Sequence, residues 1–479
     1  ALPGWRDRRP IERGRILLEL ARALRAQAAE LAALEIAETG KPAWQAPVEI
    51  ELAAAYFELY GGLVNALHGE VIDIGPGYHA YTRREPYGVV GVITPWNSPI
   101  NQAARGIAPA LAAGNTVVAK PSELTPASTV RLAQLASACG LPAGAFNVVL
   151  GPGPEAGAAL VEHPGVRKVA FTGSVRAGRE VGRIAAERLI PLTLELGGKS
   201  PNLVFADADL AAAVPGALRA FVANAGQVCS AGTRILVERS IHDAFVAALG
   251  AAVAQARPGQ ALGPISTQAQ YARVLDYLEV ARGEGATAVA GGQRAADPAL
   301  AAGWYVEPTI FTGVDPAARI AREEIFGPVL GILPVDGIDE ATVSAAATEM
   351  NVEGLRDLLA RRVGVLRAEG VGVQGDPWQT EAALARGGSG EGAHETRAVF
   401  GREPFERGHL RAVGVVGRQR AGDARVSVDD GEARAALALR VTAVLERGDA
   451  EPPTERLQER LARVGRHAHR ASIDDEVDL

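Results

Sequence analysis

The sequence is poor in cysteine, methionine and aromatic residues. It contains 2 cysteines and 1 methionine in 479 residues, and Phe, Trp and Tyr together make up 5%. Two cysteines, Cys139 and Cys229, cannot form a disulfide scaffold, so they indicate a reducing compartment, for which we take the cytoplasm. No run of about 18 or more apolar residues occurs, so we expect no transmembrane helix and no membrane partner.

An excess of positive charge is also absent. The chain has 49 Lys and Arg against 56 Asp and Glu, a net charge of −7 and a pI near 5.8. This balance gives no electrostatic reason to expect a nucleic acid as partner. The opening residues contain no apolar signal core. The 8 histidines lack the spacing of metal ligands, and we expect no metal site.

The length of 479 residues predicts two or three domains, since one core seldom grows so large. Apolar periodicity indicates helices over 11–38 and about 47–66, and 69–87 is typical of a hairpin. From residue 88 onward, short β-rich runs alternate with helical stretches, which predicts a parallel sheet of Rossmann type. The expected strands are 89–94, 116–119, 147–150 and 168–171, and the expected helices are 103–113, 126–139 and 154–163.

Cys229 lies among small residues in Gly-Gln-Val-Cys-Ser-Ala-Gly (226–232), and Glu195 lies in Leu-Glu-Leu-Gly-Gly-Lys-Ser-Pro (194–201). A thiolate is a strong nucleophile, and a carboxylate nearby can activate a thiol or a water molecule. Taken alone, Cys229 is more typical of a small buried core residue than of a catalyst, and Glu195 is also typical of a strand residue paired with a surface cation.

Further motifs occur in the same order along the chain: Gly-Val-Ile-Thr-Pro-Trp-Asn-Ser-Pro (91–99), Lys-Pro-Ser-Glu-Leu-Thr-Pro (120–126), Phe-Thr-Gly-Ser (171–174) and Glu-Glu-Ile-Phe-Gly-Pro (323–328). Together with the Cys229 and Glu195 motifs, they closely resemble the NAD(P)-dependent aldehyde dehydrogenase superfamily. The resemblance is close over residues 1–349. It implies an α/β fold with a Rossmann-type cofactor domain, an α/β catalytic domain and a protruding oligomerisation hairpin.

The resemblance implies a non-acylating oxidation of an aldehyde to a carboxylic acid. Cys229 would attack the aldehyde, and the amide of Asn97 with the backbone N–H of Cys229 would bind the oxyanion. Glu195 would then activate the water that hydrolyses the thioester. Without the resemblance, Asn97 is also typical of a turn. We take Lys199, in the Glu195 motif, as a supporting residue near the catalytic centre.

For the cofactor, the resemblance implies NAD. Lys120 and Glu123 would hold the adenosine ribose, and a carboxylate there disfavours the 2′-phosphate of NADP. Gly173 and Ser174 precede a predicted helix whose N-terminus can bind pyrophosphate. The remaining cofactor positions are expected around the nicotinamide and its ribose, although the aromatic ones among them are also typical of a core: Thr94, Pro95, Trp96, Leu196, Glu324 and Phe326.

These assignments divide the chain into an NAD-binding domain (1–195), interrupted by the hairpin at about 68–86, and a catalytic domain (196–393). Family members have further β-strands and most of a helix before the equivalent of Trp5. We therefore expect this sequence to begin later than those of the family members. After Glu349 the family motifs fade, and 394–479 is an atypical Arg-, Ala- and Glu-rich segment that we expect to be partly helical or disordered.

The resemblance further implies a homodimer or homotetramer acting on a small-molecule aldehyde. Two alternatives stay open. The altered C-terminal part would suit a cofactor-binding remnant with impaired catalysis. A dehydrogenase that transfers the acyl group to coenzyme A is the other, but such relatives commonly lack the carboxylate found here at Glu195.

Overall fold

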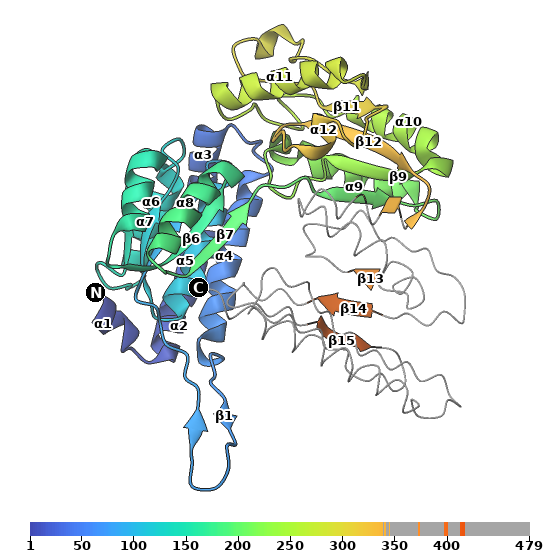
Figure 1. Cartoon of the computed structure of the whole chain (residues 1–479). Helices are drawn as coiled ribbons and strands as arrows, with labels where there is room; N and C mark the ends of the chain where they lie inside the picture. Colours follow the sequence, from blue (N-terminus) through green and yellow to red (C-terminus); the bar gives the residue numbers. More distant parts are fainter. Residues whose placement is uncertain (339, 342–343, 345–371, 374–396, 401–411, 417–479) are drawn as a thin grey trace, which may run out of the picture. The chain divides into compact units, whose positions relative to one another are not determined.

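The computed structural model of the chain describes residues 1–338, 340–341, 344, 372–373, 397–400 and 412–416 (Figure 1). The chain separates into two compact units. The first contains the described residues up to 344, and the second contains 372–373, 397–400 and 412–416. Most of the segment 394–479, which we expect to be partly helical or disordered, lies outside the described residues.

The first unit begins with four helices, and local sequence explains where several of them begin and end. They are α1 (Leu2–Arg6), α2 (Pro10–Ala26), α3 (Ala28–Thr39) and α4 (Ala46–Gly62), the last followed by the 3₁₀ turn η1 (Leu63–Asn65). Pro10 occupies the first turn of α2, where its missing N–H is not needed. Gly40, with φ of 73°, ends α3 in the left-handed conformation. The single helix expected over 11–38 is divided at Gln27.

The first sheet has five parallel strands in the order β5-β4-β3-β6-β7. The chain therefore starts in the middle of the sheet, moves to one edge and then crosses to the other, which is a doubly wound arrangement. The strands are β3 (Val89–Ile93), β4 (Thr116–Lys120), β5 (Phe146–Val148), β6 (Val166–Gly173) and β7 (Leu192–Leu196). The predicted α/β fold with a Rossmann-type sheet is confirmed.

Helices cover both faces of this sheet. They are α5 (Pro99–Ala112), α6 (Ala127–Ala138), the π-helical turn η2 (Gly153–Gly157), α7 (Ala158–Glu162) and α8 (Val175–Glu187). Val90 and Val92 of β3 pack with α2, α4, α5 and α6, whereas Ile93 packs with α7 and α8. Opposite faces of one strand thus enter different cores, as a strand buried on both sides requires.

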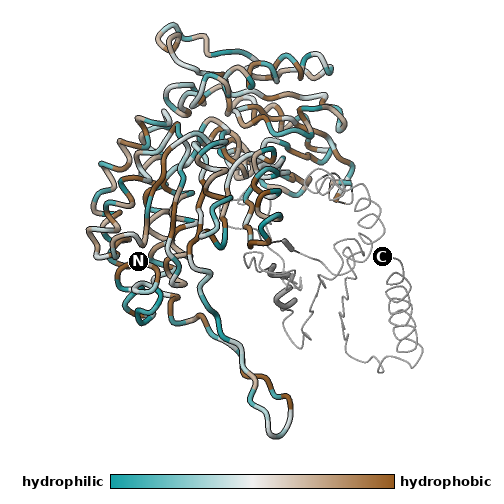
Figure 2. The backbone as a smooth tube through the Cα atoms, turned by 60° about the vertical axis from the view of Figure 1, so that its left-hand side comes forward, coloured by the Kyte–Doolittle hydropathy of each residue, from teal (hydrophilic) through white to brown (hydrophobic). Residues whose placement is uncertain are grey.

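A β-hairpin interrupts the first part of the chain between α4 and β3, within the predicted range. Its strands are β1 (Val71–Ile72) and β2 (Ala80–Tyr81), which pair antiparallel. The hairpin extends away from the helices (Figure 1), and its apolar side chains are exposed, with Val71 at 79% and Tyr81 at 66%. Figure 2 shows hydrophobic residues near its tip.

The second sheet, β10-β11-β12-β9-β8, follows the first in the chain. All its pairings are parallel except β10 with β11. Its strands are β8 (Pro201–Val204), β9 (Arg234–Glu238), β10 (Thr287–Ala290), β11 (Thr309–Thr312) and β12 (Val329–Val335). The helices between them are α9 (Leu210–Val222), η3 (Ala223–Gly226), η4 (Arg239–Ile241), α10 (His242–Val253), α11 (Gln268–Gly283), η5 (Pro298–Leu300) and α12 (Arg319–Arg322).

The second unit has a three-stranded sheet in its described part. The strands β13 (Gly372–Val373), β14 (Arg397–Phe400) and β15 (Ala412–Val416) are arranged in that order, with β13 parallel and β15 antiparallel to β14.

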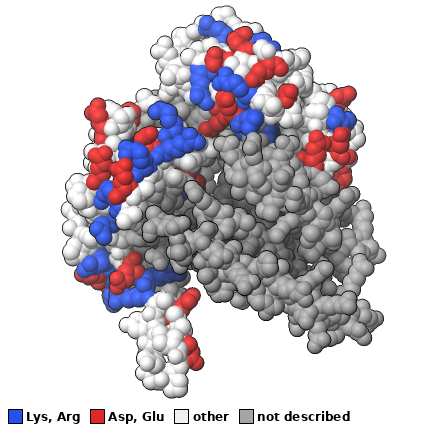
Figure 3. Space-filling model, viewed as in Figure 1, with Lys and Arg blue, Asp and Glu red and all other residues white. Residues whose placement is uncertain are grey.

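On the described surface, acidic and basic side chains are interspersed (Figure 3). No helix within the described ranges has both the length and the apolar character that a bilayer crossing requires.

Candidate active site

The residues predicted to bind the cofactor gather at the carboxyl edge of the first sheet. Thr94, Pro95 and Trp96 follow β3, while Lys120 ends β4, Gly173 ends β6 and Leu196 ends β7. In a doubly wound sheet, ligands bind outside the carboxyl ends of the strands, where the strand order reverses. Here that point lies between β3 and β6. The topology therefore places these residues along one edge.

Lys120 and Glu123 form an ion pair at the end of β4. The Lys120 ammonium is buried and lies 2.8 Å from a Glu123 carboxylate oxygen, whose side chain is about half exposed. Partial burial by itself raises the pKa of Glu123, but the hydrogen bond from Lys120 and backbone donors outweigh it and leave the pKa below its ordinary value. Glu123 is thus held ionised, and about half of its side chain is open to solvent.

Ser174 begins α8 directly after β6. Its hydroxyl accepts a hydrogen bond from the backbone N–H of Ala177 at 3.2 Å, so it is the N-cap of the helix. Leu196, at the end of β7, packs so closely against Gly178 of α8 that a Cβ there would lie 2.5 Å from a Leu196 methyl group. The helix N-terminus is therefore fixed next to the strand ends.

Cys229 follows a backbone segment with unusual conformation. Asn224 and Ala225 have φ values of 49° and 53°, in the left-handed region that non-glycine residues rarely adopt. Gly226 has φ of 71°, and a Cβ on it would lie 2.1 Å from the carbonyl oxygen of Gly327. Only glycine fits at 226, because the main chain of the predicted nicotinamide loop passes directly against it.

Asn97 lies between β3 and α5 and is buried. Its side-chain Nδ2 donates a hydrogen bond of 2.8 Å to the carbonyl of Gln227, two residues before Cys229. Asn224 Nδ2 in turn donates to the carbonyls of Asn97 (2.9 Å) and Gln227 (3.2 Å). The predicted oxyanion donor and the predicted nucleophile loop are therefore joined, and one amide hydrogen of Asn97 is left for a ligand.

Several charges act on Cys229. Burial is the largest influence and raises the pKa of the Cys229 thiol, Arg105 opposes this, and Glu324 and Glu195 reinforce it. The structure thus brings the predicted nucleophile and the predicted base into one electrostatic neighbourhood. Glu195 lies on β7, and its carboxylate forms an ion pair of 2.8 Å with Arg105 of α5.

Glu324 packs against the main chain of the Glu195 motif. A Cβ on Gly197 would lie 2.0 Å from a Glu324 carboxylate oxygen, so glycine here leaves room for Glu324 in its present position. Burial raises the pKa of Glu324, although a hydrogen bond from the Gly198 backbone opposes the shift. Lys199 is also buried, which lowers its pKa to about 7, and its Nζ has no hydrogen-bond partner among the described residues.

Trp96 and Phe326 meet although they are far apart in the sequence. Their rings lie edge to face, with centroids 5.4 Å apart and an interplanar angle of 88°. Phe326 has φ of 60°, and Gln270 fixes its turn by donating from Nε2 to the carbonyls of Ile325 and Phe326. The two predicted nicotinamide-side aromatics therefore form one wall.

Sequence reasoning did not identify all the residues at this site. Arg105 was not singled out, whereas the structure makes it the ion partner of Glu195. Its position on the helix that follows Asn97 was the available signal. Asn224 and Gln227 were not singled out at all, and only the proximity of Gln227 to Cys229 in the sequence indicated a role.

Comparisons with known proteins agree with one another. The family model described as "Aldehyde dehydrogenase family" matches residues 1–355. A betaine aldehyde dehydrogenase of Mesorhizobium japonicum is 45% identical over 359 residues, which is 74% of this chain and 73% of the relative. An NAD⁺ complex of a Bacillus cereus aldehyde dehydrogenase is 39% identical with a TM-score of 0.70, covering 75% of both chains. An NAD-dependent aldehyde dehydrogenase from Sinorhizobium meliloti is 39% identical with a TM-score of 0.69, covering 75% of this chain and 74% of that one.

Proposed function

Because the chain belongs to the aldehyde dehydrogenase family, we propose that it oxidises a small aldehyde to the carboxylic acid with NAD⁺. The balanced reaction consumes the aldehyde, one water and NAD⁺, and it releases the acid, NADH and a proton. The observation that carries the proposal is the convergence of Cys229, Glu195 and Asn97, which come from three separate segments, on one place.

Cys229 acts as the nucleophile. Its thiolate adds to the aldehyde carbon, and the carbonyl oxygen becomes an oxyanion. The free amide hydrogen of Asn97 and the backbone N–H of Cys229 donate to that oxyanion. The hydrogen bond between Asn97 and Gln227 supports this role, because a donor already fixed in place needs no reorganisation during the reaction.

The residues at the strand ends suit a dinucleotide. Thr94 Oγ1 and Glu324 Oε1 are buried polar atoms that lack a hydrogen-bond partner in the described part of the chain, as expected of groups that bind a ligand hydroxyl or amide. Lys120 and Glu123 would hold the adenosine ribose, Gly173 and Ser174 the pyrophosphate, and Trp96, Pro95, Leu196 and Phe326 the nicotinamide side. When bound, NAD⁺ supplies the hydride acceptor.

Glu195 acts as the general base in the second half of the reaction. It removes a proton from water, the resulting hydroxide attacks the thioester carbon, and the sulfur of Cys229 leaves as thiolate. In the resting arrangement the Glu195 carboxylate pairs with Arg105, so this ion pair opens before Glu195 accepts the proton. Arg105 thus orients the base between turnovers.

The exposed hairpin supports an assembly role. Apolar side chains such as Val71, Ile72 and Tyr81 are exposed on it, and burying them against another copy removes apolar surface from water. We therefore propose a homodimer or homotetramer, located in the cytoplasm. Light scattering of the purified protein checks the assembly, since a monomer at micromolar concentration contradicts it.

The test is NADH formation. Purified protein is mixed with NAD⁺ and a panel of aliphatic, aromatic and betaine aldehydes, the last because the relative from Mesorhizobium japonicum carries that name. Cys229→Ala abolishes NADH formation, while Cys139→Ala, which alters the other cysteine, leaves it intact. Absence of NADH with every aldehyde, despite measurable NAD⁺ binding, supports the catalytically impaired alternative instead.

Glu195→Gln separates the two half-reactions. The variant retains a burst of NADH close to one equivalent per active site, because Cys229 and Asn97 are intact, but steady-state turnover falls by about 10²–10⁴-fold without a general base. Added coenzyme A leaves turnover of the wild-type protein unchanged. A strict requirement for coenzyme A refutes water as the acceptor.

A further inference from the structure

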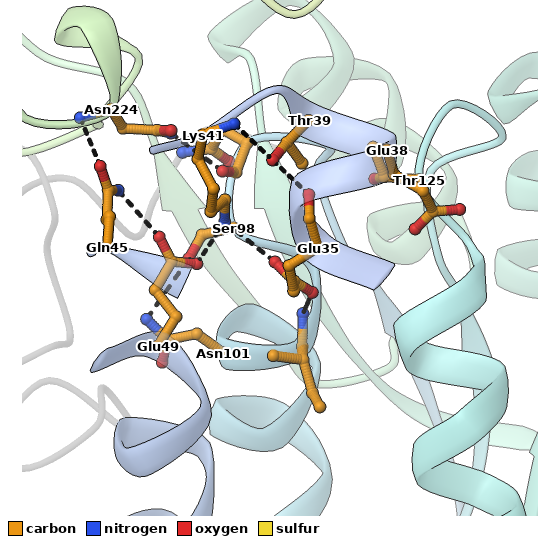
Figure 4. Close-up of polar contacts among 12 residues, drawn as sticks. Glu35, Glu38, Thr39, Lys41, Gln45, Glu49, Ser98, Asn101, Thr125 and Asn224 are labelled. Carbon is orange, nitrogen blue, oxygen red and sulfur yellow. Dashed lines mark hydrogen bonds and ion pairs between the residues drawn. The ribbon is translucent and has the colours of Figure 1, made fainter. Parts of the chain in front are cut away.

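A charged cluster lies buried beneath the candidate active site, formed by Glu35 of α3, Lys41 of the following loop and Glu49 of α4 (Figure 4). The Lys41 ammonium lies 2.9 Å from Glu35 and 2.7 Å from Glu49, and all three residues are at most 6% exposed. Burial alone would lower the pKa of Lys41, but the two carboxylates outweigh it and raise the pKa. Lys41 is therefore a permanent cation between two carboxylates.

Each carboxylate also holds the segment that follows Asn97. Glu35 Oε1 accepts a hydrogen bond of 3.0 Å from the backbone N–H of Ile100, and so caps the N-terminus of α5 from another helix. Glu49 Oε2 accepts a short hydrogen bond from the hydroxyl of Ser98. Ser98 is the N-cap residue of α5, yet its hydroxyl makes no capping bond and is used on Glu49 instead.

The cluster reaches the Cys229 loop by a second route. Gln45 donates from Nε2 to Glu49 Oε1 at 3.0 Å, and its own side-chain oxygen accepts the backbone N–H of Asn224 at 2.9 Å. Asn224 has the left-handed conformation and donates to the carbonyl of Asn97. Gln45 thus connects Glu49 to the strained residue that joins the two catalytic segments.

A third route runs through the end of α3. The Thr39 hydroxyl donates to the carbonyl of Glu35, and the Thr39 carbonyl accepts the hydroxyl of Ser266 at 3.1 Å. The backbone N–H of Ser266 donates to Gln227 Oε1 at 2.8 Å. Gln227 is 1% exposed and also accepts the amide of Asn97 on its carbonyl. The loop that contains Gln227 and Cys229 is thus held both through Asn224 and through Ser266.

We propose that the buried Glu35–Lys41–Glu49 cluster is a positioning device that sets the Asn97 amide and the Cys229 loop in their reactive arrangement. The inference rests on the proposed function of Asn97 and Cys229. None of the three residues contacts those two side chains in the described structure, so they act through Ser98, Ile100, Gln45 and Asn224. A buried ion cluster seldom stabilises a fold better than apolar residues of the same volume, and in some proteins buried polar groups instead select one arrangement of the structure.

Lys41→Met tests the proposal, because it keeps the length of the side chain and removes the cation between the carboxylates. Displacement of a reacting group by about 1 Å can cost 10²-fold in rate, so we expect kcat to fall about 10- to 100-fold. The dissociation constant for NAD⁺ is expected to stay within twofold of wild type, since the strand-end residues do not contact the cluster. A loss of stability alone would not separate kcat from cofactor affinity in this way.

Arg13→Met is the matched control. Arg13 is also a buried cation, and it donates to the backbone carbonyls of Arg6, Arg8 and Ala112, the last at the opposite end of α5. The substitution Arg13→Met removes a buried charge next to the same helix, α5, without altering the contacts of residues 97–100 or 224–227. We expect this variant to retain wild-type kcat after correction for the folded fraction.

Hydrogen exchange gives a readout that does not require activity. In Lys41→Met, the amides of 98, 100, 101 and 224–228 are expected to exchange at least tenfold faster, whereas in Arg13→Met they keep wild-type rates. Unchanged exchange in both segments of Lys41→Met overturns the proposal, even if the protein oxidises no aldehyde. Wild-type protein without NADH formation refutes the proposed function alone, and the exchange result still decides the positioning role.

A triple variant covers the case in which Lys41→Met fails to fold because two buried carboxylates lose their partner. Glu35→Gln, Lys41→Met and Glu49→Gln together remove every charge and preserve the side-chain shapes, leaving one acceptor oxygen instead of two at positions 35 and 49. We expect this protein to fold, with faster exchange in both segments and reduced kcat. If it shows wild-type exchange and wild-type kcat, the charges of the cluster have no positioning role. Ser98→Ala, which breaks one connection only, is expected to reduce kcat by a smaller factor.

Discussion

Replacing Arg105 with Gln should affect the two half-reactions in opposite directions. Arg105 stabilises the Cys229 thiolate, because it is the largest influence that lowers the pKa of this otherwise buried thiol. It also pairs with Glu195 at 2.8 Å. Removing the guanidinium therefore raises the pKa of Cys229 further and leaves Glu195 free to accept a proton. Attack on the aldehyde slows, and hydrolysis of the thioester accelerates.

The size of the effects of Arg105→Gln is estimated from the solvent exposure of the Arg105–Glu195 ion pair. The side chains of Arg105 and Glu195 are 33% and 44% exposed, so solvent screens the interaction. Ion pairs of this kind contribute about 0.2–1 kcal/mol. If the attraction between Arg105 and the Cys229 thiolate lies in the same range, its loss shifts the ionisation equilibrium of the thiol about 1.4- to 5-fold. Below the pKa, the thiolate population then falls by about 1.4- to 5-fold.

Alkylation by iodoacetamide measures the thiolate directly. The rate constant between pH 7 and 9 is compared in a Cys139→Ala background, where Cys229 is the remaining thiol. We expect Arg105→Gln to react about 1.4- to 5-fold more slowly. Arg131→Gln is the matched control, since Arg131 of α6 pairs with Glu30 of α3 at 2.9 Å and is not among the charges that act on Cys229. An equal or faster rate in Arg105→Gln refutes the reasoning.

Three further predictions concern pH and packing. Because burial raises the pKa of Cys229, kcat/KM for aldehydes should climb steadily from pH 7 to 9, and a plateau near neutrality would contradict this. Lys199 has a pKa lowered to about 7, so the folded state binds its proton less well than the unfolded state does. The resulting destabilisation is complete below pH 7 and disappears as the pH approaches the pKa of free lysine. Lys199→Met should therefore increase the urea midpoint at pH 7 and much less at pH 10; equal gains at both pH values would argue against it. Gly226→Ala should lower the unfolding free energy by about 1–3 kcal/mol or more, because its φ is positive and the Gly327 carbonyl blocks a Cβ. Gly250→Ala, where the added Cβ meets nothing within 4 Å, is the control.

The first sheet was accessible from sequence because its signals are local. Strands β3, β4 and β6 are short apolar runs separated by helical stretches, and that alternation alone predicts parallel pairing. The start of α5 was placed too late, at 103 instead of Pro99. The signal was present, since proline is favoured in the first turn of a helix. The break between α2 and α3 at Gln27 had no such signal in the sequence, because no glycine or proline marks it.

The partners of the proposed catalytic residues and of the segments that carry them could not be predicted in the same way. Glu35 and Ile100 are 65 positions apart, and Glu49 and Ser98 are 49 apart. A glutamate on an amphipathic helix is ordinarily on its solvated face, so nothing in the pattern of α3 distinguishes Glu35 from a surface residue. Similarly, only the folded sheet brings Arg105 of α5 beside Glu195 of β7. Motifs predict the reacting groups, and tertiary packing determines what holds them.

The last turn of α3 has a practical consequence for engineering. Glu35 caps α5, and Glu38, one turn later, caps α6 by accepting the backbone N–H of Ala127. The loop that follows is a tempting place to insert a peptide tag or open a circular permutant, because Trp44 there is 56% exposed. An insertion or a new terminus in this loop would separate the two capping residues, Glu35 and Glu38, from Gln45 and Glu49. Mutant libraries aimed at new substrates should hold residues 35–49 constant and vary the pocket alone.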